Sequence, residues 1–121
     1  MDFEYLTTQA MDQNEAIKIA KRYVDTISRK YQVENAILFG SFAKGTNHTD
    51  SDIDIAIIFN SVDDIIDLQI ELMNMRSDDD LLIEPHPFKK SDFNNSNPVV
   101  AEILKNGIEI RKTKHRNSKQ N

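Results

Sequence analysis

The stretch "AILFGSFAKGTNHTDSDIDIAIIF" (residues 36–59) decides the fold, because two apolar runs flank a polar loop within it. The first run ends at Gly40, and the second, residues 53–59, is rich in the β-branched side chains of buried strands. Two carboxylates, Asp52 and Asp54, stand two residues apart at the start of the second run. Charged residues at this spacing beside a buried strand need a chemical reason.

Helices and strands are expected to alternate along the chain. Asp12 is of a type favoured at helix N-caps, Pro98 suits a first helical turn, and Gly107 suits a helix end. The expected helices are residues 12–31, 62–75 and 98–106, and the expected strands are residues 35–39, 53–59, 81–88 and 108–110. Because Pro85 and Pro87 cannot donate to a ladder, the later half of the third strand should lie at a sheet edge or leave the sheet. The order predicts an α/β domain with a small mixed β-sheet packed with helices.

The composition narrows the class of protein. A chain of 121 residues fits one domain, and the absence of cysteine excludes disulfides and thiolate metal sites. The first residues are polar and acidic, unlike a signal peptide, and no apolar run approaches the ~20 residues of a membrane helix. We therefore expect a soluble cytoplasmic protein without membrane contact.

The charge is distributed unevenly. Residues 111–121 contain five basic and no acidic side chains, whereas the remaining residues contain ten basic and twenty acidic ones. This asymmetry predicts a domain over residues 1–110 and a basic, flexible tail over residues 111–121. Direct binding of nucleic acid is not expected of so acidic a body, because phosphate contacts depend on lysine and arginine.

The loop after the first strand has the features of a phosphate site. Gly40 and Gly45 allow a close approach of the backbone to a ligand, and Ser41 adds a hydroxyl at a point where a helical turn can begin. A P-loop is excluded, since Thr46 and Asn47 follow the second glycine where lysine and serine or threonine are required. The loop is therefore of another phosphate-binding kind.

The two aspartates predict a magnesium site next to this loop. Residues two apart in a strand point to the same face, with Cα atoms ~6.6 Å apart. Asp52 and Asp54 would thus converge and repel each other unless a hard cation such as Mg²⁺ lies between them. A calcium loop is excluded, because Ile55 replaces its turn glycine and Ser61 its final glutamate.

Gly40-Ser41 followed after ten residues by Asp52-x-Asp54 resembles the motif of the DNA polymerase beta-like nucleotidyltransferase superfamily. The short chain resembles the minimal nucleotidyltransferase branch, often encoded beside a HEPN-domain partner, and the resemblance covers residues 37–110. It implies the polymerase beta-like palm fold. It also implies two Mg²⁺ ions and ATP or another nucleoside triphosphate as the substrate.

The resemblance assigns roles residue by residue. The residues implied to bind the nucleotide phosphates are Gly40, Ser41 and Lys44. Those implied to ligate the metal and to carry catalysis are Asp52, Asp54 and Glu84. Glu84 is the best match for the third carboxylate, with Asp80 as the alternative, and it would help deprotonate the acceptor hydroxyl. His86 would share a face with Glu84 if the strand stays extended, whereas His48 and His115 have no assigned role.

The acceptor is expected to come from outside this short chain. The branch implies an antitoxin that transfers AMP from ATP onto a tyrosine of a HEPN ribonuclease toxin. One alternative is a small-molecule nucleotidyltransferase similar to aminoglycoside-modifying enzymes, with the acceptor bound at a homodimer interface. Another is an antitoxin that acts by binding alone, its catalysis lost.

Overall fold

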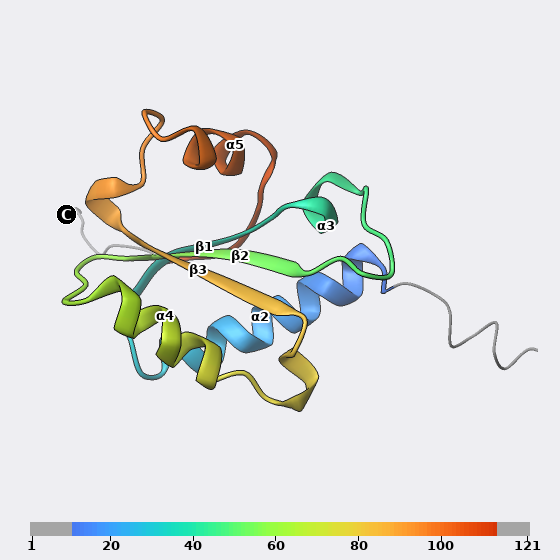
Figure 1. The fold of residues 1–121 in the computed structure, drawn as a ribbon, viewed down its shortest axis with the longest axis horizontal. Helices are drawn as coiled ribbons and strands as arrows, with labels where there is room; N and C mark the ends of the chain where they lie inside the picture. The colour runs from blue at the N-terminus through green and yellow to red at the C-terminus, as the bar shows by residue number, and fades with distance from the viewer. Residues whose placement is uncertain (1–10, 114–121) are drawn as a thin grey trace, which may run out of the picture.

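The computed structural model describes residues 11–113, which form a four-stranded sheet with helices on both faces (Figure 1). The central strands are β1 (Val33–Phe39) and β2 (Ile53–Phe59), and the edge strands are β3 (Ile83–Lys89) and β4 (Ile108–Lys112). β1 pairs antiparallel with β2 and β4, whereas β2 pairs parallel with β3. The sheet is therefore mixed, and the predicted α/β class is confirmed.

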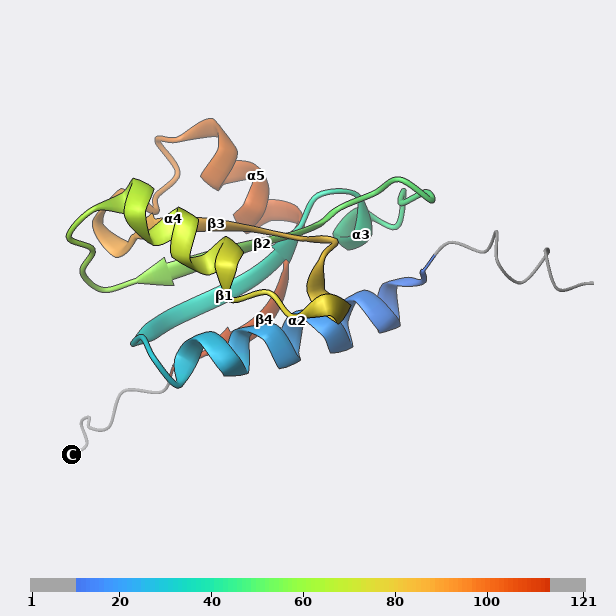
Figure 2. The same ribbon diagram turned by 60° about the horizontal axis from the view of Figure 1, so that its bottom comes forward.

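The faces of the sheet carry different helices, as Figures 1 and 2 show. The helices α2 (Gln13–Ser28) and α4 (Ile65–Asn74) cover one face, and α5 (Pro98–Asn106) lies on the other. The β2 residues that pack in the cluster with α2 and α4 are Ile53, Ile55, Ile57 and Phe59. Ala56 and Ile58 point the opposite way and pack with α5. This alternation places Asp54 on the face that α5 covers only in part.

The helix ends follow the predicted capping residues. The Asp12 carboxylate accepts from the N–H of Glu15 at 2.8 Å, so α2 begins where the sequence predicted. It ends at Ser28, three residues before the expected end. The N–H of Gly107 donates to the carbonyl of Ile103 at 2.8 Å and closes α5. Local sequence therefore fixes most of these boundaries.

The edge strand β3 accommodates its two prolines without leaving the sheet. It pairs with β2 over its whole length, from Ile53 opposite Ile83 to Phe59 opposite Lys89. Pro85 is two residues from Pro87, so both missing N–H groups fall on the same side of the strand, away from β2. The prediction of an edge position is confirmed.

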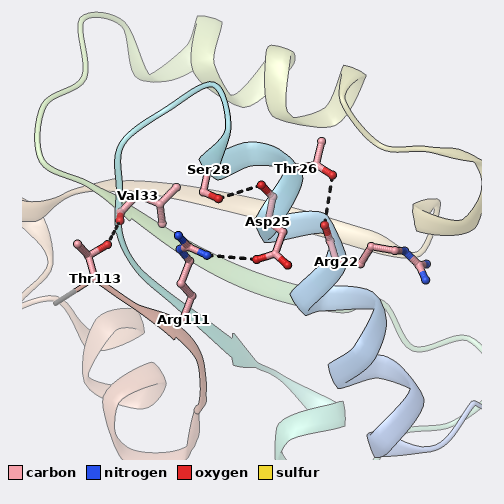
Figure 3. A network of polar contacts seen from close by, with 7 residues as sticks. All are labelled: Arg22, Asp25, Thr26, Ser28, Val33, Arg111 and Thr113. Atoms are coloured by element: carbon pink, nitrogen blue, oxygen red, sulfur yellow. Dashed lines mark hydrogen bonds and ion pairs between the residues drawn. The ribbon is translucent and has the colours of Figure 1, made fainter.

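The last strand extends further than the sequence predicted. β4 continues to Lys112, and Arg111 pairs with Asp25 of α2 at 3.2 Å (Figure 3). Beyond it, the Thr113 hydroxyl donates to the carbonyl of Val33. Arg111 and Lys112 therefore belong to β4, and Thr113 is hydrogen-bonded to β1; the other residues of the predicted tail, 114–121, lie outside the described part.

Three short elements complete the described part of the chain: α3 (Ser41–Lys44), η1 (Asp78–Asp80) and η2 (Lys90–Asp92). α3 follows β1 directly and carries the loop predicted to bind phosphate. Between residues 11 and 113, no helix has the length and apolar character needed to span a membrane.

Candidate functional site

Three side chains from β2 and β3 meet on the face of the sheet that carries α5. Asp54 stands directly opposite Glu84 in the parallel register. The next pair that points to the same face is Ala56 with His86, two residues further along. Among the described residues, one potential ligand atom from each of Asp54, Glu84 and His86 lies within 4.8 Å of the others. Because neighbouring strands supply these groups, the geometry follows from the sheet register.

His86 is fixed by two contacts. Its Nε2 lies 3.1 Å from Asp54 Oδ1, and its ring makes an edge contact with the Phe39 ring at 5.0 Å between centroids. The strand stays extended, so the prediction that His86 shares a face with Glu84 is confirmed. Sequence reasoning gave His86 no firm role because its contact with Asp54 depends on the register between strands.

Gly40 presses the loop against the Asp54 carboxylate. Its φ of +80° and ψ of −156° fall in a region nearly confined to glycine. A Cβ built at this position would lie 2.5 Å from Asp54 Oδ2, which is closer than side chains can approach. Glycine is therefore required here both for the backbone conformation and for the space that the carboxylate fills.

Ser41 begins α3 and is tied to the end of the same loop. Its hydroxyl donates to the Ser51 hydroxyl at 2.9 Å, which also accepts from the N–H of His48 at 2.9 Å. Ser51 is 6% exposed, one of two buried polar residues among those described. Ser51 was not predicted as a site residue, because its role depends on hydrogen bonds that form only when the loop closes. It closes residues 41–51 into one unit.

Lys44 lies on the side of α3 that faces α5. Its ammonium is 3.2 Å from Glu102 Oε2, and both side chains are about half exposed. Hydrogen bonds from Asn106 and Lys44 hold the pKa of Glu102 below its usual value. The predicted contact of Lys44 with a triphosphate would share its ammonium with Glu102 or draw it away from this ion pair.

Asp52 and Asp80 do not belong to the group of three. Asp52 precedes the first residue of β2 and is exposed, so the strand geometry that predicted its convergence with Asp54 begins one residue too late. Asp80 is 5% exposed, and its carboxylate accepts from the Ser77 N–H and hydroxyl at 3.0 and 2.9 Å. Asp80 is therefore buried in its own turn, and Glu84 is the acid that lies close to Asp54.

The site is an open surface between the loop and the strands. Cavities of about 340 and 300 Å³ lie elsewhere, the first beside Phe59 and α4 and the second beside Asn35 and Lys112. Neither is lined by Gly40, Asp54 or Glu84. The donor set of two carboxylates and one imidazole fits a divalent cation, and the adjacent loop offers backbone N–H groups and a hydroxyl.

These features agree with the similarity of the sequence to known proteins. Residues 21–116 match the family model described as "Polymerase beta, Nucleotidyltransferase". The chain therefore belongs to the polymerase beta nucleotidyltransferase family, as the Gly40-Ser41 and Asp52-x-Asp54 motif predicted. A search of curated proteins found no match.

Several solved structures share the fold. A Sulfolobus solfataricus protein described as a nucleotidyltransferase is 19% identical with a TM-score of 0.64, over 83% of both chains. An MntA-HpeT toxin-antitoxin mutant is 22% identical with a TM-score of 0.54, over 85% of this chain and 74% of that one. A toxin-antitoxin with AMP-PNP is 21% identical with a TM-score of 0.50, over 85% and 75%. At such identities the likeness concerns the fold.

Proposed function

We propose that this nucleotidyltransferase transfers a nucleoside monophosphate, AMP from ATP, to a hydroxyl of a partner protein. The observation that carries the proposal is the close approach of Gly40 to Asp54, where the loop that begins α3 abuts a carboxylate that lies near Glu84. A phosphate-binding backbone beside paired acids suits a triphosphate bound together with a cation. Family membership supports the reaction class.

The loop and the carboxylates have different tasks in this proposal. Gly40 and Ser41 hold the β- and γ-phosphates through the loop backbone and the Ser41 hydroxyl. This hydroxyl donates to Ser51 in the structure and would donate to a phosphate oxygen instead when the nucleotide is bound. Asp54 and Glu84 would hold one Mg²⁺ ion. A second ion would bind when Asp52 also takes part. A bound divalent ion neutralises charge on the phosphates.

Glu84 also receives the proton of the acceptor hydroxyl. Its side chain is exposed and stands beside Asp54, so an acceptor can approach it from solvent. The hydroxyl oxygen then attacks the α-phosphorus, the bond to the bridging oxygen breaks, and pyrophosphate leaves. Positioning supplies most of the rate in such a scheme.

The partner is proposed to be the HEPN-domain toxin of a toxin-antitoxin pair. Two structures that share the fold are toxin-antitoxin assemblies, and one of them contains AMP-PNP. The exposure of the site supports an acceptor supplied by another macromolecule, because Glu84 is exposed and Asp54 and His86 are only partly buried.

The test is transfer of label from α-labelled ATP with Mg²⁺, using the protein co-purified with the product of its neighbouring gene. We expect label on the partner with wild type and none with Asp52→Asn/Asp54→Asn. Label on small molecules alone would favour the aminoglycoside-like alternative. A stable complex without label from any nucleoside triphosphate would favour an antitoxin that acts by binding.

A further inference from the structure

We propose that His86 is a metal ligand, and that Asp54, Glu84 and His86 together bind a first-row transition-metal ion such as Mn²⁺ in preference to Mg²⁺. The inference rests on the metal site of the proposed function and changes the identity of its ion. It makes His86 the residue that determines metal specificity.

The spacing of the ligand atoms fits a single ion. Two ligands about 2.1 Å from an octahedral ion and at right angles to each other lie about 3.0 Å apart. His86 Nε2 and Asp54 Oδ1 are 3.1 Å apart, and a Glu84 oxygen completes a group within 4.8 Å. Because Glu84 is exposed, rotation of its side chain can bring this oxygen closer, and the three ligands can then occupy one face of an octahedron without rearrangement of the backbone.

The three ligands are held by rigid elements. All of them come from paired strands, with Asp54 opposite Glu84 and His86 two residues further along β3 on the same face. The Phe39 ring fixes the plane of the imidazole, and Gly40 limits the movement of the Asp54 carboxylate. Preorganised ligands lose little conformational entropy on binding, which favours an ion that binds before the nucleotide.

The donor chemistry sets the preference. Mg²⁺ selects oxygen ligands almost exclusively, whereas imidazole nitrogen suits the first-row transition metals. A site of two carboxylates and one imidazole offers Mn²⁺ both hard oxygens and a nitrogen. Alternatively, His86 only donates a hydrogen bond to Asp54, in which case its nitrogen never contacts the ion.

Pulsed electron paramagnetic resonance of bound Mn²⁺ separates these two roles. We would add Mn²⁺ to tag-free protein, alone and with inorganic triphosphate, a phosphate source without nitrogen. We expect ¹⁴N modulation of the Mn²⁺ spin echo from wild type and its loss in His86→Gln, which keeps a hydrogen-bonding amide for Asp54. His48→Gln is the matched control, since His48 lies outside the group of three, and it should keep the modulation.

Three results would overturn the inference. They are bound Mn²⁺ without ¹⁴N modulation, modulation that survives in His86→Gln, and no Mn²⁺ binding with or without triphosphate. A Mg²⁺ affinity equal to that for Mn²⁺, measured by competition, would remove the proposed preference. Label transfer with Mg²⁺ tests the proposed function separately, so transfer without ¹⁴N modulation would refute only the role of His86.

Discussion

Replacing Gly40 by alanine tests whether the loop and the Asp54 carboxylate form one site. The backbone conformation of Gly40 is nearly confined to glycine, and holding another residue in it costs about 1–3 kcal/mol. The new Cβ would also lie 2.5 Å from Asp54 Oδ2, so the carboxylate or the loop has to move. With a cost for overpacking added, we expect Gly40→Ala to lower the free energy of unfolding by about 2–4 kcal/mol.

Gly45→Ala is the matched control in the same loop. Gly45 has φ +75° and ψ 19°, and a Cβ there meets no atom within 4 Å. Only the left-handed conformation is penalised, so the loss of stability should be about 1–2 kcal/mol. The metal site should also remain intact in this variant.

Urea unfolding of both variants, followed by circular dichroism, gives the two stabilities. A thermal shift with Mg²⁺-ATP or Mn²⁺ reports binding, since a ligand at 100 times its dissociation constant stabilises the fold by about 2.7 kcal/mol. We expect the shift to be lost in Gly40→Ala and kept in Gly45→Ala. Equal losses of stability and equal shifts in the two variants would refute the coupling of Gly40 to Asp54.

Other substitutions separate chemistry from support. Glu84→Gln should abolish label transfer while changing the free energy of unfolding by less than about 0.5 kcal/mol. Asp80→Asn should lower the free energy of unfolding by about 1–3 kcal/mol and retain transfer at temperatures where the variant is folded. The reverse pattern would make Asp80 the third carboxylate. Ser51→Ala should cost about 1–2 kcal/mol and raise the KM for ATP more than it lowers kcat, measured by steady-state kinetics, because the loop loses its closure. Burial raises the pKa of Tyr23, whose hydroxyl donates to the Leu72 carbonyl at 2.6 Å. The wild type should therefore lose stability as the pH rises above about 10, where the tyrosine ionises in the unfolded chain. Urea unfolding at about pH 9–11 should show a shallower loss for Tyr23→Phe.

Local patterns were enough to predict the elements of the fold. Capping residues located α2 and α5, a short apolar run located β1 and a β-branched run located β2, because these signals act over a few neighbouring residues. The prolines placed β3 at an edge. The end of β4 was missed, because the contacts that extend it, Arg111 with Asp25 and Thr113 with Val33, join residues far apart in sequence.

The site was predicted less completely, for the same physical reason. Gly40 and Asp54 were predicted from a motif and Glu84 from the family resemblance, but the contacts of their neighbours depend on register and loop closure. Strand alternation was extended to Asp52, although β2 begins at the next residue. Ser51 carries no motif of its own, and its role follows only from two hydrogen bonds that bring the ends of the loop together.

Asp54 is the residue on which both proposals depend, and its neighbours distinguish them. Asp52 lies outside β2 and is exposed, so it can join the ligands only when a nucleotide and a further ion draw it in. His86 already contacts Asp54 without either. Asp54→Asn should therefore abolish metal binding under all conditions, Asp52→Asn only the part that depends on nucleotide, and His86→Gln the nitrogen ligand alone. Titration of Mn²⁺ with and without triphosphate would resolve the three patterns. Equal effects of all three variants would mean that the three residues do not have the separate roles in metal binding that the strand register implies.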